Sequence, residues 1–76
     1  MAYNGHKNWN YWNVALWIAN DESLYRLARA CLKGYAGNRT QCARGMLLEL
    51  RDRGITATPD GAPYSISSIR AAMVDL

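Results

Sequence analysis

Two cysteines and one histidine are the residues of this 76-residue chain best suited to nucleophilic or metal chemistry. Cys31 or Cys42 needs an oriented base such as His6 to act as a nucleophile, and nothing in the sequence orients that imidazole. A zinc site needs further ligands at metal-binding spacing, and none is evident. We therefore expect no metal, no cofactor and no enzymatic activity. Both thiols are interpreted as reduced core residues, with a disulfide or a reactive thiol as the alternatives.

Serines and carboxylates are also explained without catalysis. Ser65, Ser67 and Ser68 cluster where a helix is predicted to begin, which is typical of helix capping. The six Asp and Glu residues fall at predicted caps, turns and exposed helix faces. No glycine-rich phosphate loop is present, because Gly34 and Gly37 lack the lysine that such a loop requires.

Basic residues are more informative, since nine Lys and Arg exceed six Asp and Glu and give a net charge of +3. This mild excess suits nucleic acid or an acidic protein partner. Cations recur on the faces of predicted helices, and the serines at the start of the last helix offer polar atoms to phosphates or base edges. The predicted nucleic-acid-binding residues are Arg26, Arg29, Lys33, Arg44, Arg51, Ser65, Ser67 and Arg70. The alternative is that these arginines and lysines only keep the surface soluble.

Aromatic residues interleaved with asparagines near the amino terminus predict a second kind of contact. Tyr and Trp supply contact area with few rotatable bonds, and Asn supplies adaptable hydrogen bonds. Tyr3, His6, Trp9 and Tyr11 are therefore the predicted protein-binding residues. The alternative function is a protein-binding inhibitor or adaptor of host machinery. A homodimer is a further alternative, because the chain is short and yet rich in large apolar residues.

One stretch resembles a known DNA-contacting segment. It comprises Leu50-Arg-Asp-Arg-Gly-Ile-Thr56, Asp60-Gly61, Tyr64-Ser65 and Ile69-Arg70. It is similar to the helix, hairpin and helix of the recombinase domain in large serine integrases. The resemblance covers about a third of the chain and implies DNA contact, without any part of the recombinase catalytic domain.

The opening of the chain is similar to that of short uncharacterised proteins encoded by phages and plasmids. The residues concerned are Tyr3-Asn-Gly5, Asn8, Trp12-Asn-Val-Ala-Leu-Trp-Ile18, Asn20-Asp-Glu22 and Leu24-Tyr25. This resemblance implies a mobile-element origin and assigns no catalytic residue. It favours a small protein that acts by binding DNA or host machinery.

The first predicted helix carries most of the aromatic residues. Residues 1–7 form a turn-rich arm, and Asn8 caps a helix that ends near Asn20. Two apolar stripes run along it: Trp9, Trp12 and Leu16 on one face, and Val14, Trp17 and Ile18 on another. A helix that is apolar on two sides is expected to be packed on both. We therefore expect it to be the central element, with Trp12, Leu16 and Trp17 in the core.

Three further helices are predicted by apolar spacing and by capping residues. They run from about Glu22 to Lys33, from Asn38 or Thr40 to Arg53, and from Ser65 to the end of the chain. Ile66, Ile69, Met73 and Leu76 should face inward. Between the last two helices, residues 55–64 predict a short β-hairpin or hairpin-like loop around Pro59-Asp-Gly61.

The expected fold class is therefore mainly α, a compact four-helix domain with this hairpin before the last helix. Residues 1–76 should form one domain. No leader or membrane span is evident, so we expect a cytoplasmic protein, in the host cytoplasm if it is encoded by a phage.

Overall fold

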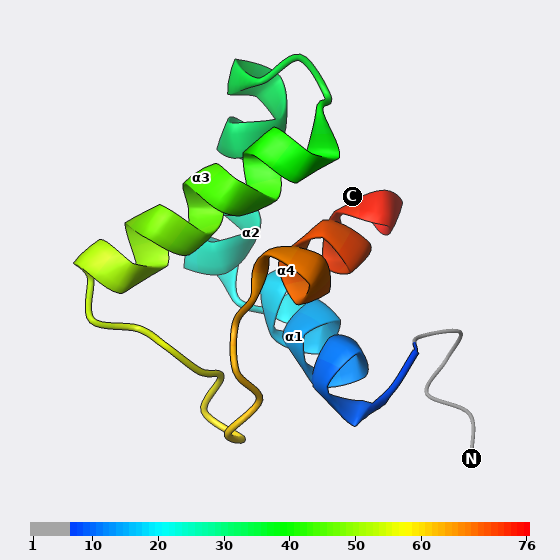
Figure 1. The fold of residues 1–76 in the computed structure, drawn as a ribbon, viewed down its shortest axis with the longest axis vertical. Coiled ribbons are helices and arrows are strands. Elements are labelled where there is room, and N and C mark those ends of the chain that lie inside the picture. Colours follow the sequence, from blue (N-terminus) through cyan, green and yellow to red (C-terminus); the bar gives the residue numbers. More distant parts are fainter. Residues whose placement is uncertain (1–6) are drawn as a thin grey trace.

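The computed structural model describes residues 7–76, except for the side chain of Asp75. Four α-helices follow one another: α1 (Trp9–Asn20), α2 (Glu22–Gly34), α3 (Arg39–Asp52) and α4 (Ile66–Ala72). A short 3₁₀ turn, η1 (Met73–Asp75), ends the chain. The prediction of a compact, mainly helical fold with four helices is confirmed (Figure 1).

Each helix begins where a short polar side chain caps its first turn. Asn8, Asp21, Asn38 and Ser65 each accept a hydrogen bond from the backbone N–H three residues later, at 3.0–3.1 Å. Such a cap satisfies one of the amide groups that the first turn leaves without a partner. Asp21 also separates α1 from α2, because its extended backbone (φ −93°, ψ 121°) interrupts the helix for one residue. The predicted helix starts are confirmed.

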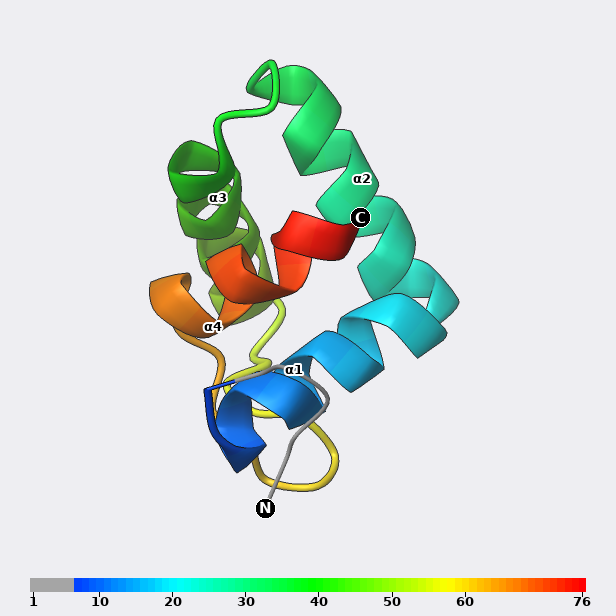
Figure 2. The same cartoon turned by 90° about the vertical axis from the view of Figure 1, so that its right-hand side faces the viewer.

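The shortest helix, α4, packs against both α1 and α3, while α2 packs against α1 and α3 from the other side. Figure 2 shows α2 and α3 as the two sides of the molecule, with the C-terminal segment between them and α1 below. The core draws on all four helices and on the loop before α4. Its largest fully buried apolar side chains are Val14, Ile18, Met46, Leu50, Ile69 and Met73.

The prediction that α1 is central, packed on two sides, is wrong. Val14 and Ile18 are fully buried, but Leu16 is 38% exposed and Trp9 is 39% exposed. Trp12 and Trp17 are half-buried instead of lying in the core. A single side of α1 makes the contacts with α2, α4 and the loop before α4. The Trp9–Leu16 stripe therefore faces away from the core.

Of the two forms predicted for residues 55–64, the β-hairpin is not supported, because residues 53–65 contain no strand in the described chain. One isolated antiparallel bridge joins Ala57 and Pro63. Two backbone hydrogen bonds cross the loop, from Thr58 N to Ala62 O (2.8 Å) and from Tyr64 N to Thr56 O (3.0 Å). Pro63 has no N–H to extend the ladder. The segment is therefore a loop that packs on the helices.

The prediction for the last helix is partly confirmed. Ile69 and Met73 are buried and Leu76 is half-buried, but Ile66 is 36% exposed at the first helical position. Ser65 and Ser68 form a reciprocal capping box, which fixes the start of the helix. Ile66, the first residue of the helix, therefore lies at the surface of the protein.

Candidate nucleic-acid interface

Two of the predicted basic residues share one exposed stripe of α3. Thr40, Arg44, Leu48 and Arg51 are spaced by three or four residues, so they lie along the same side of the helix. All four are exposed, and Leu48, at 55%, is the most exposed large apolar residue of the part of the chain that the structure describes. Among the described residues, neither Arg44 nor Arg51 has a carboxylate partner. The stripe is therefore cationic, with one leucine at its middle.

The structure brings Arg70 of α4 to this stripe. Its Nε donates a hydrogen bond of 3.0 Å to Thr40 Oγ1, across thirty positions of sequence. The α3 stripe and the exposed residues Ser67 and Arg70 of α4 are named here the α3–α4 face. Ser65, also predicted to bind, is half-buried and committed to the capping box. Its hydroxyl is therefore engaged within the chain.

The remaining predicted cations, on α2, lie on the opposite side of α3. Cys42 Sγ contacts the carbonyl oxygen of Cys31 in α2 at 3.1 Å, and Cys42 is two residues after Thr40. Residues two apart point to different sides of a helix. The side of α3 that meets α2 is thus distinct from the side that carries Arg44.

The α2 cations are also engaged locally. Arg26 forms an ion pair with Glu22, four residues earlier in the same helix, and the Arg29 guanidinium lies 6.0 Å from the Tyr25 ring centroid. Lys33 is exposed at the end of α2. The eight predicted nucleic-acid residues therefore form two groups instead of one surface.

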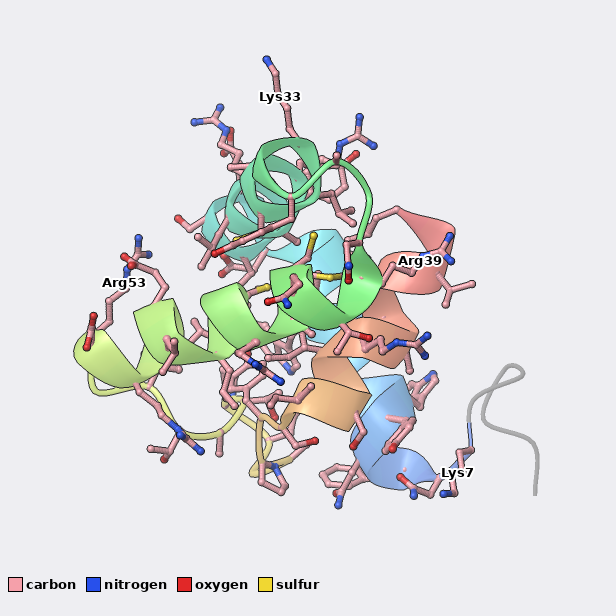
Figure 3. The ribbon with its side chains drawn as sticks, turned by 45° about the horizontal axis from the view of Figure 1, so that its top comes forward. Lys7, Lys33, Arg39 and Arg53 are labelled. Carbon is pink, nitrogen blue, oxygen red and sulfur yellow. The ribbon has the colours of Figure 1, made fainter. Side chains whose placement is uncertain are left out.

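The labelled cations in Figure 3 show how widely the positive charge is spread. Lys33 projects from the end of α2, Arg39 and Arg53 lie at opposite ends of α3, and Lys7 lies beside the start of α1. Arg53 forms an ion pair of 3.1 Å with Glu49, four residues earlier. Net charge alone therefore does not define an interface, and the α3–α4 face is distinguished by arginines that two different helices bring together.

The predicted protein-binding residues are only partly covered by the structure. Tyr3 and His6 lie outside the described residues. Trp9 is exposed on α1, whereas Tyr11 is half-buried, with Lys7 Nζ 5.9 Å from its ring centroid. Trp9 thus lies on the exposed side of α1, whereas Tyr11, three residues before the buried Val14, lies on the side that faces the core.

A polar network that was not predicted fastens the loop before α4 to α1. Asp60 Oδ2 accepts hydrogen bonds of 2.9 Å from Asn13 Nδ2 and from Trp17 Nε1. Thr58 Oγ1 donates to Asn13 Oδ1 at 2.6 Å and accepts from Ala62 N at 3.0 Å. Asn13 and Thr58 are buried, so the three bonds that they make satisfy groups removed from water, whereas the Trp17–Asp60 bond is exposed. The network therefore holds the loop against α1.

The network changes the acidity of Asp60. The hydrogen bond from Asn13, followed by the one from Trp17, lowers the pKa of this carboxyl below its ordinary value. Donors aimed at a carboxylate favour its ionised form. Asp60 therefore acts as a charged acceptor that holds the loop.

Beside this network lies a groove of about 520 Å³. It is bounded by the junction of α1 and α2 and by the loop after α3. Burial, together with the charge of Asp21, raises the pKa of Tyr64 in its wall, so the phenol stays neutral. The lining residues are Trp17, Asp21, Ser23, Leu24, Arg53, Ile55, Ala57, Pro59 and Tyr64.

Neither cysteine is activated for catalysis. Cys42 is buried as predicted, whereas Cys31 is only half-buried, and burial raises the pKa of both thiols. A nucleophilic cysteine needs the opposite shift, toward the thiolate. The described residues contain no group of three His, Cys, Asp or Glu side chains placed to hold a metal ion.

Within residues 7–76, no helix combines the length and apolar character needed to cross a membrane. No curated protein and no solved structure matches the chain. A family model does match the chain, over residues 1–76. It is the model of DUF7249, a family of unknown function. The chain therefore belongs to the DUF7249 family.

Proposed function

We propose that this protein is a noncatalytic nucleic-acid-binding protein that uses the α3–α4 face. The observation that carries the proposal is the Arg70–Thr40 hydrogen bond, because it joins a cation of α4 to the stripe of α3. Three arginines from two helices then lie on one face.

The spacing of these arginines suits a phosphate backbone. Arg44 and Arg51 are two helical turns apart, about 10 Å along the axis. Successive phosphates of one DNA strand rise about 3.4 Å along the duplex axis, so two such cations can follow one strand. Of the two acidic residues of α3, Glu49 is paired with Arg53, whereas the exposed Asp52 follows Arg51 and reduces the positive charge at that end of the stripe. The exposed Leu48 and Ile66 offer apolar contact with sugars or bases.

The likeness of residues 3–25 to short phage and plasmid proteins supports a binding role of this kind. A small regulator of a mobile element would act in the host cytoplasm. The likeness of residues 50–70 to the DNA-contacting segment of serine integrases supports the choice of the α3–α4 face, because that segment includes Arg51 and Arg70.

Binding to duplex and single-stranded oligonucleotides, measured by fluorescence anisotropy over a range of salt concentrations, tests this proposal. We expect affinity to fall steeply with salt, and Arg44→Ala, Arg51→Ala and Arg70→Ala each to reduce the slope of log K against log salt by about 1. Arg26→Ala is the matched control, because Arg26 is paired with Glu22 on another face. Equal losses in all four variants, or no binding, would contradict the proposal.

Protein binding through the start of α1 is the alternative, and the exposure of Trp9 favours it. A pull-down from host lysate with and without nuclease separates the two functions. Capture of nucleic acid that nuclease removes supports the α3–α4 face. A stoichiometric host protein that resists nuclease and is lost in Trp9→Ala would support the alternative instead.

A further inference from the structure

An exposed aromatic ring lies where α2 leads into α3. Tyr35 directly follows α2 and is 47% exposed. A Cβ built at Gly45 of α3 would be 3.1 Å from Tyr35 Cε2 and 3.2 Å from its hydroxyl oxygen, but 3.5 Å from Cζ, which lies between those two atoms. The ring therefore turns an edge to Gly45, and its two faces stay clear of that residue.

The contact between this ring and Gly45 is not explained by core packing. Glycine inside a helix is less favourable than alanine, and Gly45 lies in the middle of α3. A close approach at a glycine could offset this cost by burying the ring, yet Tyr35 remains exposed. A local rule that is broken without a gain in packing is expected at functional sites. The position of Tyr35 therefore points to a role at the surface.

The sequence around Tyr35 is cationic. Residues 23–48 contain five Arg or Lys and no Asp or Glu. Lys33, Arg39 and Arg44 are the three of these cations nearest to Tyr35 in the sequence, and all are exposed. Figure 3 shows Lys33 and Arg39 projecting from the two helix ends that the loop after α2 joins. The first carboxylate that follows on α3, Glu49, is paired with Arg53.

Arg44 links the ring to the α3–α4 face. It directly precedes Gly45, which the ring contacts, and it lies about one helical turn after Thr40. Thr40 in turn accepts the hydrogen bond from Arg70. Arg70, Arg44 and Tyr35 therefore follow one another across the N-terminal half of α3, so the cations of the face lead up to an aromatic ring.

We propose that the ligand of the α3–α4 face is a single-stranded nucleic acid, with one base stacked on Tyr35 and phosphates on Arg44 and Arg70. This inference rests on the proposed function and names its substrate class. Proteins that bind single strands combine a cationic track for the backbone with aromatic rings that stack on bases, and every base has a face that can stack. In a duplex the bases are stacked on one another, so only a single strand can give a base to Tyr35.

Fluorescence anisotropy with a labelled oligonucleotide, alone and as a duplex, tests the substrate class. We expect the single strand to bind more tightly than the duplex. Tyr35→Ala should weaken binding of the single strand at least about fivefold and leave binding of the duplex unchanged, whereas Tyr35→Phe should keep the native affinity. Tyr25→Ala is the matched control, because Tyr25 is 39% exposed but lies about 15 Å away along α2.

A strand of abasic sites with the same number of phosphates separates stacking from a general effect on the fold. Tyr35→Ala should bind this strand as well as the native chain does, because no base is left to stack. Arg44→Ala should weaken binding of the abasic strand and of the normal strand alike, because both carry phosphates. Circular dichroism checks that each variant keeps its helices.

The outcomes distinguish this inference from the function on which it rests. If Tyr35→Ala binds the single strand as well as the native chain, or loses affinity equally for the abasic strand, stacking on Tyr35 is overturned. A duplex bound as tightly as the single strand would also overturn it. In each of these cases a loss in Arg44→Ala would still support nucleic-acid binding by the α3–α4 face. Absence of binding to every oligonucleotide would overturn both.

Discussion

The pKa of the Asp60 carboxyl group depends on hydrogen bonds that form only in the folded protein. From the sequence, Asp60 is part of a turn, Pro59-Asp-Gly61, and turns favour Asp for local reasons. In the structure it instead accepts hydrogen bonds from two side chains of α1, which lower its pKa. A carboxyl whose pKa is lowered by folding stabilises the native state most when it is ionised.

The expected pH dependence follows from the direction of this shift. The contribution of Asp60 is fully present above its unfolded pKa, near 3.8, and is lost as the pH falls through the lower folded value. Asp60→Asn should therefore flatten the acid branch of stability against pH. Trp17→Phe, which removes one of the two donors, should flatten it less. Urea unfolding at a series of pH values measures this, and an unchanged acid branch in Asp60→Asn would contradict the prediction.

At the scale of the element, α3 shows how a local rule and a tertiary contact compete. Gly45 lies inside the helix, where glycine costs about 1 kcal/mol relative to alanine. The ring of Tyr35, just after α2, lies over it. A Cβ added at Gly45 would be 3.1 Å from Tyr35 Cε2 and 3.2 Å from its hydroxyl oxygen. The glycine therefore leaves room for this ring.

Gly45→Ala should nevertheless stabilise the protein by up to about 1 kcal/mol. Tyr35 is 47% exposed, so its ring can move by the few tenths of an ångström that the new methyl group needs. Thermal and urea unfolding measure the change. The same substitution in a Tyr35→Ala background should give the whole gain. A loss of stability in the native background that Tyr35→Ala relieves would show that the ring cannot move.

At the scale of the whole molecule, the loop between α3 and α4 is held by residues far apart in the sequence. Asn13 joins Thr58 and Asp60 across more than forty positions. The loop in turn leads into α4, which packs on both α1 and α3. A substitution of Asn13 should therefore alter the position of α4.

Asn13→Ala should lower the free energy of unfolding by about 1–3 kcal/mol, because it leaves the buried Thr58 hydroxyl without its acceptor. Urea unfolding measures this loss, and amide exchange at Ala62 should accelerate with it. Asn10→Ala is the matched control, since Asn10 is exposed on the same helix and its loss should change stability by no more than about 0.5 kcal/mol. Equal effects of the two variants would show that the network is not stabilising.

Local interactions made the helices predictable. Asn8, Asp21, Asn38 and Ser65 cap their helices through contacts only three residues long, so the sequence contains both partners of each bond. Apolar spacing likewise predicted α2 and α3 as helices, because the residues that repeat along one helix side are near neighbours in the sequence. The i, i+4 ion pairs of Glu22 and Glu49 were predictable for the same reason.

The sequence by itself thus determined where helices begin and which cations share a helix face, since both depend on near neighbours. Only the tertiary structure decided which apolar stripe of α1 is buried, because Val14 and Leu16 are equally suited to a core and the neighbouring helices cover one side alone. It also decided that residues 53–65 form a loop fastened to α1, because the hydroxyl of Thr58 and the carboxylate of Asp60 bond to Asn13, far away in the sequence. The grouping of Arg70 with Arg44 and Arg51 depends on the packing of α4 against α3, which no periodicity within one helix contains.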